Sequence, residues 1–328
     1  MARKGANKVD GWLVLDKPVG IGSTSALGRV RRALNAAKAG HAGTLDPLAS
    51  GVLVIALGEA TKLIGAVMDT DKSYRFTVRW GEATETDDAE GAVIAACSVR
   101  PSRTEIEAAL PRFTGLVTQV PPVFSAIKLQ GKPAYARRRA GETVQMAPRQ
   151  VRIDEFELLG QPDQDHAIFR VKCGKGTYIR SLGRDLAVAL GTVGHVAELR
   201  RLAVGRFTEA AAIPLEKLES VGHSPAALAY LRAVETALDD IPALAVTAED
   251  SLRLRQGQSV AIQRTAEIPV DRDAAAPFAT GQVVAATALG RLVALTMVDG
   301  DRLRPLRVLN LEPGRTAQNG EPSDVDYG

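Results

Sequence analysis

One segment of the sequence could present a reactive side chain to a substrate, and it reads Gly40-His-Ala-Gly-Thr-Leu-Asp-Pro-Leu-Ala-Ser-Gly51. Its carboxylate, Asp46, precedes Pro47, and the proline ring disfavours a helical conformation for the residue before it. The flanking glycines allow another backbone or a ligand to approach closely. The pattern predicts one acid on a rigid, accessible loop, although a single loop aspartate more often forms an Asx turn or a cap.

Motifs for metals and for nucleotide cofactors are missing from the sequence. The histidines form no HxxxH or His/Cys cluster, and Cys97 and Cys173 have no CxxC partner, so we predict no metal site. The Gly174-Lys-Gly-Thr177 turn lacks the spacing of a phosphate-binding GxxxxGKS/T loop, no GxGxxG follows a predicted strand, and no GxSxG elbow occurs. We therefore expect ordinary side chains to carry any chemistry, without a cofactor.

The elements around the acidic loop can be predicted from periodicity. Residues 52–57 are a continuous apolar run, which predicts a buried strand directly after the loop. Residues 73–80 alternate between apolar and polar types, which predicts a strand with Tyr74 on its apolar face. Residues 177–190 have helical periodicity, so Arg180 should lie near the start of a helix. Further predicted elements are strands at 11–15 and 167–173, a helix at 23–35, and a helix through 110 that starts with a capping box formed by Thr104 and Glu107.

The length of 328 residues predicts roughly two domains. We place a boundary near residue 240, between a larger domain at 1–240 and a small, mostly β module at 241–310. In the module, Thr247 should cap a short helix, and strands are predicted at 283–289, 292–298 and 303–309. The polar end, 311–328, is predicted to be a disordered tail.

The N-terminus and the cysteine content predict where the protein works. The first ten residues contain no apolar core of a secretory signal, and no apolar run is long enough to span a membrane. Two cysteines give no disulfide framework. We expect a reduced, cytoplasmic protein.

The net charge of +3 conceals two strongly basic regions. Residues 1–41 carry eight Lys or Arg against two Asp, and residues 121–152 carry seven Lys or Arg against one Glu. Such clusters suit a polyanion such as nucleic acid, and they equally suit solvated basic faces. Because residues 121–152 are also rich in proline and glycine, we interpret them as an inserted, mobile segment.

Several further motifs occur in order along the chain, and with the Asp46 loop they resemble the bacterial TruB-type tRNA pseudouridine synthases over about residues 9–215, with a weaker likeness through 310. The resemblance implies an α+β fold with a mixed-sheet pseudouridine synthase core, a basic thumb-like insertion and a small PUA-like C-terminal domain. The motifs are Gly11-Trp-Leu-Val-Leu-Asp-Lys-Pro18, Gly58-Glu-Ala-Thr-Lys62, Asp71-Lys-Ser-Tyr-Arg75, Thr84-Glu-Thr-Asp-Asp88, Gln119-Val-Pro-Pro-Val-Phe-Ser-Ala-Ile-Lys128, Cys173-Gly-Lys-Gly-Thr-Tyr-Ile-Arg180 and His195-Val-Ala-Glu-Leu-Arg-Arg-Leu202.

The resemblance implies an isomerisation of uridine 55 in the T-arm of tRNA. Uracil leaves C1′ of its ribose, turns, and rejoins the sugar through C5. Substrate and product are isomers, so no cofactor is required, in agreement with the missing motifs. The target lies in a folded loop and would have to be flipped out of its stack, and Asp46 would act as the nucleophile.

Two further residues receive catalytic roles from the resemblance. Arg180 would keep Asp46 ionised, because burial alone drives a carboxylate toward its neutral form. Tyr74 would stack on the flipped base and could transfer a proton at C5. Without the resemblance, Arg180 would be interpreted as a surface ion pair or phosphate contact, and Tyr74 as a core aromatic residue.

The resemblance also implies contacts to the RNA. Tyr178 would pack against the target nucleotide and Leu199 against its base, while His41 would help to fill the space that the base leaves. Asp88 would lie near the base or the arginine, and Lys17 would support the loop or a phosphate. Structural alternatives exist for Tyr178, Leu199, His41 and Asp88, in core packing, a loop hydrogen bond or a turn. The RNA backbone would be held by Lys128, Lys132, Arg137, Arg138, Arg139 and Arg149.

Three other functions compete with this hypothesis. A non-catalytic RNA-binding or RNA-folding protein on the same scaffold could lose Asp46, so the presence of Asp46, Tyr74 and Arg180 favours the enzyme. A guide-RNA-dependent synthase of the archaeal and eukaryotic type is the second alternative, and the intact insertion favours independent action. A plain structural module explains neither the motif order nor the charge asymmetry. We expect a monomer that binds tRNA and needs no protein partner, metal or membrane.

Overall fold

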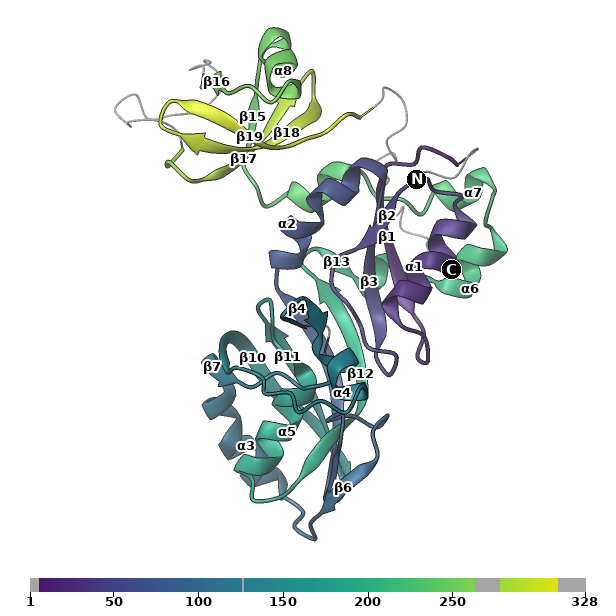
Figure 1. Cartoon of the computed structure of the whole chain (residues 1–328), viewed down its shortest axis with the longest axis vertical. Coiled ribbons are helices and arrows are strands. Elements are labelled where there is room, and N and C mark those ends of the chain that lie inside the picture. Colours follow the sequence, from purple (N-terminus) through teal and green to yellow (C-terminus); the bar gives the residue numbers. More distant parts are fainter. Residues whose placement is uncertain (1–5, 126, 263–277, 312–328) are drawn as a thin grey trace, which may run out of the picture.

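The computed structural model describes residues 6–125, 127–262 and 278–311. A large mixed sheet with its helices forms the main body, and a smaller five-stranded sheet lies at one end of the molecule (Figure 1). The predicted fold class, an α+β protein with a mixed-sheet core and a small β module, is confirmed. None of the described helices is long and apolar enough to cross a lipid bilayer.

The main sheet has ten strands among the described residues. Eight of them run in the order β14-β1-β3-β12-β4-β11-β10-β7, with β2 joined to β3 and β13 to β12. Most neighbours are antiparallel, whereas β1 pairs with β14 and β3 with β12 in parallel. The strands are β1 (Gly11–Lys17), β2 (Ala39–His41), β3 (Ser50–Leu57), β4 (Lys72–Trp80), β7 (Gly115–Gln119), β10 (Arg149–Asp163), β11 (His166–Cys173), β12 (Gly194–Val204), β13 (Phe207–Thr208) and β14 (Ile213–Pro214).

The strand β3 separates two apolar cores, as its continuous apolar run predicts. On one face, Leu53 and Ile55 join the core that contains residues of α1 and α5. On the other face, Val52 and Val54 join a core that includes Val67 of α2. The α-helices are α1 (Ser23–Ala33), α2 (Ile64–Asp69), α3 (Arg103–Ala109), α4 (Ala134–Arg139), α5 (Ile179–Ala189), α6 (Leu215–Ser220), α7 (Pro225–Leu228) and α8 (Ala248–Arg255). Short 3₁₀ turns are η1 (Gly58–Leu63), η2 (Leu110–Phe113), η3 (Glu209–Ala211) and η4 (Val234–Leu238).

The strand β4 follows its predicted alternation. Phe76 and Trp80 are buried, whereas Arg75 is exposed. Phe76 stacks against Phe169 of β11, with 5.4 Å between the ring centroids. Tyr74 lies two residues before Phe76 and packs against the same core, so the face of β4 that bears Tyr74 is fixed by the buried aromatic residues.

The predicted start of α3 is wrong. The capping box is formed by Ser102 and Glu105 rather than by Thr104 and Glu107. The Ser102 hydroxyl accepts a hydrogen bond from the Glu105 backbone N–H at 3.3 Å, and the Glu105 carboxylate accepts one from the Ser102 N–H at 2.7 Å. Both pairs have the capping-box spacing, but Ser102 has the extended backbone that an N-cap requires, and Thr104 already lies inside the helix.

Two other predicted helix limits differ by two residues. The helix α1 ends at Ala33 rather than at 35, and Asn35 beyond it has a φ of 46°, which a helix cannot contain. The helix α5 begins at Ile179 rather than at 177, because Tyr178 keeps an extended backbone.

The basic region at 121–152 contains regular structure that its composition did not predict. The strands β8 (Lys128–Leu129) and β9 (Lys132–Pro133) pair as a hairpin, and α4 follows. From Arg149 onward the chain belongs to β10 and pairs with β7 in the main sheet. The part that leaves the sheet therefore ends at about 148, and its mobility stays a prediction. We call residues 120–148 the insertion.

A second hairpin and a second sheet complete the described chain. The hairpin joins β5 (Glu82–Thr84) to β6 (Val93–Ala96), next to the main sheet. The C-terminal sheet has the order β15-β17-β18-β19-β16, and Thr247 caps α8 beside it as predicted, since its hydroxyl accepts from the Asp250 N–H at 3.0 Å. These strands are β15 (Ala243–Ala245), β16 (Val260–Ala261), β17 (Val283–Ala288), β18 (Arg291–Asp299) and β19 (Arg302–Val308).

The C-terminal sheet is joined to the main body by specific contacts. Lys62 Nζ donates to the Val308 carbonyl at 2.8 Å, and the Asn310 N–H donates to the Glu59 carboxylate at 2.6 Å. Leu295 of β18 also packs in the core that contains Val52 and Val54 of β3. The domain limits at 240 and 310 stay predictions. Apart from Leu311, the tail predicted to be disordered lies outside the described residues.

Candidate active site

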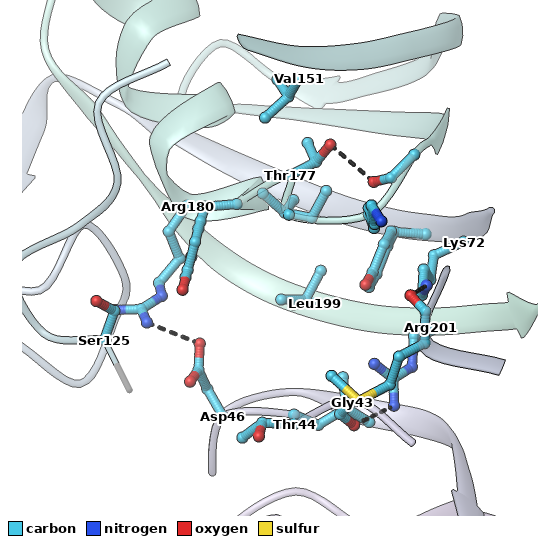
Figure 2. A pocket seen from close by; sticks show the side chains of 18 of the residues that line it. Gly43, Thr44, Asp46, Lys72, Ser125, Val151, Thr177, Arg180, Leu199 and Arg201 are labelled. Atoms are coloured by element: carbon cyan, nitrogen blue, oxygen red, sulfur yellow. Dashed lines mark hydrogen bonds and ion pairs between the residues drawn. The ribbon is translucent and has the colours of Figure 1, made fainter. Parts of the chain in front are cut away.

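The main sheet and the loop between β2 and β3 enclose a cavity of about 580 Å³. Its walls come from residues 43–46 of the loop, the start of β10, the turn at 174–178 and the neighbouring strands β4 and β12. Figure 2 shows Asp46 and Arg180 pointing toward each other, with Leu199 near the middle of the site. The volume lies in the range of pockets that bind small molecules or single nucleotide units.

The carboxylate of Asp46 faces the guanidinium of Arg180. Arg180 Nη2 lies 2.9 Å from Asp46 Oδ2 (Figure 2). The arginine side chain is 5% exposed and the aspartate side chain is 37% exposed. The carboxylate therefore opens to the cavity while the cation supports it from the protein interior. The structure brings together two predicted residues that are far apart in sequence.

Both terminal nitrogens of the Arg180 guanidinium have additional partners in the protein. Its Nη1 lies 3.3 Å from Oδ2 of Asp88, a side chain that is 2% exposed. The carbonyls of Thr86 and Phe124 accept hydrogen bonds from Nη1 and Nη2, each at 2.9 Å. A buried guanidinium is costly unless it is paired and hydrogen-bonded, so these four partners fix its position. The predicted residue Asp88 thus lies in the arginine network.

The Asp46 carboxylate is destabilised as an anion by its surroundings. Burial raises the pKa of Asp46, the positive charge of Arg180 opposes this rise, and the negative charge of Asp88 adds to it. Lys17 also favours the ionised form, by a smaller amount. A carboxylate that is poorly solvated yet open to a cavity is more reactive than one in water, which is the arrangement found at perturbed functional sites.

The Asp46 loop is fixed by hydrogen bonds to its main chain. The Ser23 hydroxyl at the start of α1 accepts from the Leu45 N–H at 2.7 Å and donates to the Leu45 carbonyl at 2.8 Å. The Gly20 N–H donates to the Pro47 carbonyl at 2.8 Å. Both residues that flank Asp46 are therefore tied to the segment between β1 and α1, which explains how a loop can hold its carboxylate in one place.

The side chain of Lys17 also holds the segment between β1 and α1. It is fully buried, and its Nζ donates to the carbonyls of Pro18 at 2.8 Å and Ile21 at 2.6 Å. Burial lowers the pKa of Lys17 to about 8, while the negative charge of Asp46 raises it. Of the two predicted roles, loop support and phosphate contact, the hydrogen bonds match the first.

Two neighbouring strands form the wall of the cavity where a base could lie. In the register of β4 and β12, Leu199 is opposite Phe76 and Arg201 is opposite Tyr74. Tyr74 and Leu199 both line the cavity, so an aromatic and an aliphatic side chain from neighbouring strands contribute to the same wall as Asp46. Burial raises the pKa of Tyr74, and a hydrogen bond and the positive charge of Arg201 oppose the rise.

Tyr178 lines the other side of the cavity and is held by its main chain. Its N–H donates to Gln119 Oε1 at 2.8 Å, and Gln119 Nε2 donates to the Tyr178 carbonyl at 3.0 Å. The guanidinium of Arg149 lies over the Tyr178 ring, 4.8 Å from its centroid. Arg149, predicted as a contact to the RNA backbone, therefore lies at the cavity rather than in the insertion.

Some predicted site residues lie away from the cavity. His41 is the last residue of β2 and is not among the residues that line the cavity; its Nδ1 is buried without a hydrogen-bond partner among the described residues. The remaining basic residues belong to the hairpin β8–β9 and to α4 of the insertion: Lys128, Lys132, Arg137, Arg138 and Arg139. Their roles in RNA binding stay predictions.

Three buried polar residues at the cavity were not singled out by the sequence. Lys72, Ser125 and Arg201 line it, and all three are buried. Each belongs to one of the ordered motifs, which was the available signal. Their side chains gave no periodicity or spacing that separates them from their neighbours. Among the described residues, no group of His, Cys, Asp and Glu is arranged to hold a metal ion.

Comparison with known proteins shows the family of the chain. Residues 31–179 match the N-terminal domain of the TruB family pseudouridylate synthases, and residues 180–239 match a C-terminal domain of tRNA pseudouridylate synthase B. A tRNA pseudouridine synthase B of Bradyrhizobium diazoefficiens is 51% identical over 97% of the chain and 92% of its own length. One of Caulobacter vibrioides is 50% identical over 94% of the chain and 99% of its own length.

Solved structures support the same fold. A chain in an H/ACA ribonucleoprotein bound to a substrate RNA containing 2′-deoxyuridine has a TM-score of 0.68, with 24% identity over 92% of this chain and 85% of that one. A chain of a Cbf5–Nop10–Gar1 complex has a TM-score of 0.69, with 25% identity over 91% and 84%. The likeness covers both the main body and the C-terminal sheet.

Proposed function

The chain belongs to the TruB family of pseudouridylate synthases, and from that premise we propose that it converts uridine 55 in the T-arm of tRNA to pseudouridine, with Asp46 as the nucleophile. The proposal rests above all on one observation, the Asp46 carboxylate held 2.9 Å from the buried Arg180 guanidinium at the wall of a cavity. As a tRNA pseudouridine synthase the protein is an isomerase, so its chemistry needs no redox partner.

The proposed reaction uses the cavity as a receptor for one everted nucleotide. Flipping a base from a stack costs a few kcal/mol, which contacts in the pocket must offset. Tyr74 and Leu199 provide apolar surface for the uracil ring, and Tyr178 provides a second aromatic side chain. The stacked base would lie within reach of Asp46, whose attack is favoured because its carboxylate is poorly solvated.

The insertion would hold the rest of the T-arm. Arg138 and Arg139 are exposed and Arg137 is partly exposed on a short helix, where they can reach phosphates without disturbing the core. RNA is recognised mainly through phosphates, 2′-hydroxyls and shape, which suits such a surface. We propose that the insertion closes over the T-loop, and that His41 assists by occupying space next to the flipped nucleotide.

A non-catalytic RNA-binding role is the second candidate. It would explain the exposed arginines, but it would not explain why Asp46 opens to a cavity while its cation is almost fully buried. Dependence on a guide RNA is the less favoured alternative, because the chain carries its own basic insertion. We propose that the protein acts on tRNA as a single chain.

The central experiment measures tritium release from C5-labelled uridine in a T-arm stem-loop, with purified protein and no other component. Asp46→Asn should reduce turnover by about 10⁴-fold or more while RNA affinity stays within about threefold of the original, because only the nucleophile is lost. A matched control is Asp69→Asn, an exposed carboxylate at the rim of the same cavity that pairs with Lys175 at 2.8 Å. Equal turnover in the Asp46 variant would exclude the proposed mechanism.

Position 55 is tested separately with stem-loops in which the labelled uridine occupies another loop position. Release should occur only from the uridine at position 55, because the site accepts one nucleotide while the insertion fixes the rest of the arm. Comparable release from several positions would leave the isomerase in place and contradict the assigned target.

A further inference from the structure

Arg201 is a buried cation that the proposed reaction has not yet used. Its side chain is 1% exposed, and it lies at the wall of the cavity. Its Nε donates to the Val52 carbonyl at 2.7 Å and its Nη2 to the Gly43 carbonyl at 3.0 Å. In the described part of the chain, Arg201 forms no ion pair with a carboxylate, although the neighbouring Arg200 pairs with Asp16 at 3.0 Å. Burial of an unpaired charge is strongly unfavourable, so it calls for a functional reason.

Two other buried cations, Lys17 and Lys72, are close enough to Arg201 to feel its charge. Lys72 is buried, and its Nζ donates to the carbonyl of Met68 and to that of Thr70. Burial lowers the pKa of Lys72 and that of Lys17, and in each case the charge of Arg201 lowers it further. The region next to Arg201 therefore favours any negative charge that forms there.

The side chain best placed to carry such a charge is that of Tyr74. It is opposite Arg201 in the antiparallel register of β4 and β12, and such opposed side chains lie on one face of the sheet. Besides Arg201, the groups that influence Tyr74 are Cys173 on β11 and Asp46 on the loop. Because burial raises the pKa of Tyr74 by more than Arg201 lowers it, the resting side chain is a neutral phenol.

We propose that Arg201 is a positioning residue that stabilises the phenolate of Tyr74 while Tyr74 carries a proton between two atoms of the uracil ring. The inference rests on the proposed isomerisation. It gives Arg201 a role in the reaction, in addition to the hydrogen bonds by which this residue of β12 holds β3 and the Asp46 loop.

The order of the proton transfers follows from the neutral resting state of Tyr74. The overall reaction breaks the N1–C1′ bond, forms the C5–C1′ bond, removes the proton from C5 and leaves a proton on N1. A neutral phenol must give a proton before it can accept one. Tyr74 therefore donates its proton to N1, whose electron pair comes from the N1–C1′ bond that breaks as the Asp46 carboxylate bonds to C1′, and Tyr74 becomes a phenolate beside Arg201. C5 then bonds to C1′ and the Asp46–C1′ bond breaks, which frees the carboxylate. The phenolate takes the C5 proton, the electron pair of the C5–H bond restores the C5–C6 double bond, and the phenol is regenerated.

The first experiment compares Arg201→Met, Arg201→Lys and the matched control Arg200→Met in single turnover on the T-arm stem-loop. Loss of a hydrogen bond to a charged group should slow Arg201→Met by about 10- to 100-fold, with RNA affinity within about threefold. Arg201→Lys should fall between this variant and the original protein, and Arg200→Met should change little. A double-mutant cycle with Tyr74→Phe should show that the loss of Arg201 has no further effect once the phenol is gone.

The second experiment reads Tyr74 directly and does not depend on catalysis. Tyrosine labelled with ¹³C at Cζ should report a Tyr74 titration that moves to higher pH in Arg201→Met, measured on the folded protein without RNA. Fluorotyrosine at position 74, whose phenol is more acidic, should restore at least about tenfold of the lost rate in Arg201→Met. If the Arg201 variant does not fold, fluorotyrosines of different acidity can be placed at position 74 of a protein that retains Arg201. The rate should then change systematically with the acidity of the phenol.

The outcomes separate this inference from the proposed function. An unchanged Tyr74 titration in Arg201→Met, or a slowed variant that fluorotyrosine does not restore, would overturn the role of Arg201 even if the original protein is fully active. Absence of turnover in the original protein would instead remove the proposed function, while the Tyr74 titration would still show whether Arg201 favours the phenolate.

Discussion

Arginines occur in two contrasting settings in this protein, the cavity of the main sheet and the insertion. Arg180 in the cavity is 5% exposed and contacts two carboxylates and two carbonyls. Arg138 in the insertion is 42% exposed and forms one ion pair, with Glu85 at 3.0 Å. The same side chain is therefore part of a fixed network in one region and of a screened surface in the other.

The difference shows which electrostatic contacts can support chemistry. In the cavity, charges are poorly solvated, so each one shifts the protonation of its neighbours and holds a definite place. In the insertion, water and salt screen the charges, so a pair is worth little to stability and remains available to phosphates. We expect changes in the cavity to alter rate and pH dependence, and changes in the insertion to alter affinity and its dependence on salt.

Among the variants that compare the two regions, the largest effect should come from Arg180→Met, which breaks the cavity network. Removal of one partner from a buried ion pair costs about 3–5 kcal/mol of folding stability, so the melting temperature should drop. Turnover should fall by about 10²- to 10³-fold, the usual effect of removing one group that stabilises charge in a reaction site. The matched control is Arg184→Met, one turn later on α5, where the arginine is 27% exposed and pairs with Asp87 at 2.8 Å. Single-turnover rates and thermal melts would contradict the comparison if both variants behaved alike.

A glycine in each region tests whether the cavity is the more rigid of the two. Gly51 has a φ of 95°, and a Cβ there would lie 2.2 Å from the carbonyl oxygen of Arg201. Gly141 in the insertion has a φ of 82°, with open space around it. Gly51→Ala should cost about 3 kcal/mol, from strain plus a clash, and Gly141→Ala about 1 kcal/mol, from strain alone. Urea unfolding measures both, and equal costs would mean that β12 can move away from β3.

Much of this difference could be predicted from the sequence, and the reasons are local. The run at 52–57 and the alternation at 73–80 predicted the two strands beside the cavity, because burial on one or both faces dictates side-chain type. The fold class followed from the ordered motifs. The position of Asp46 on a constrained loop followed from Pro47 and the glycines.

The remaining features depend on contacts between distant segments. The role of Ser23 in holding the Leu45 main chain joins residues with no pattern in common. Arg201 was indistinguishable from Arg200, since the strand register alone decides which of them is buried. In the insertion, proline and glycine content indicated a loop, but a short hairpin and a helix form there.

The pH dependence should also differ between the regions. Burial raises the pKa of Asp46, and Asp88 raises it further. Since the ionised form is the nucleophile, kcat/KM should fall as the pH drops through a midpoint above the ordinary 3.8, and Asp88→Asn should move that midpoint to lower pH. Because folding raises the pKa of Asp46, the folded protein binds the proton of this carboxyl more tightly than the unfolded chain does. The contribution of Asp46 to stability is therefore lost as the pH rises through its folded pKa.

The control for this profile is Glu142→Gln in the insertion. Glu142 pairs with Arg137 at 2.6 Å in the insertion and is not among the residues that line the cavity, so its charge should have little influence on Asp46. The acid limb of the pH–rate profile should not move in this variant. A similar shift in both variants would indicate a general charge effect rather than the local influence of Asp88.

The smallest effect on rate should come from the three arginines of the insertion helix. Arg137, Arg138 and Arg139 give α4 three positive charges. The Arg139 guanidinium lies 5.8 Å from the Tyr135 ring centroid. Replacing all three by alanine should weaken binding of the T-arm stem-loop by about tenfold and reduce the slope of log affinity against log salt by about two, since three phosphate contacts are lost. At saturating RNA, the single-turnover rate should stay within about twofold, because no group at Asp46 has changed.

Arg103→Ala on α3, which removes an exposed arginine paired with Glu107 at 2.7 Å, serves as the control and should leave the slope unchanged. An unaltered slope in the triple variant would mean that the insertion does not contact phosphates, whereas a rate loss at saturation would mean that it also shapes the cavity.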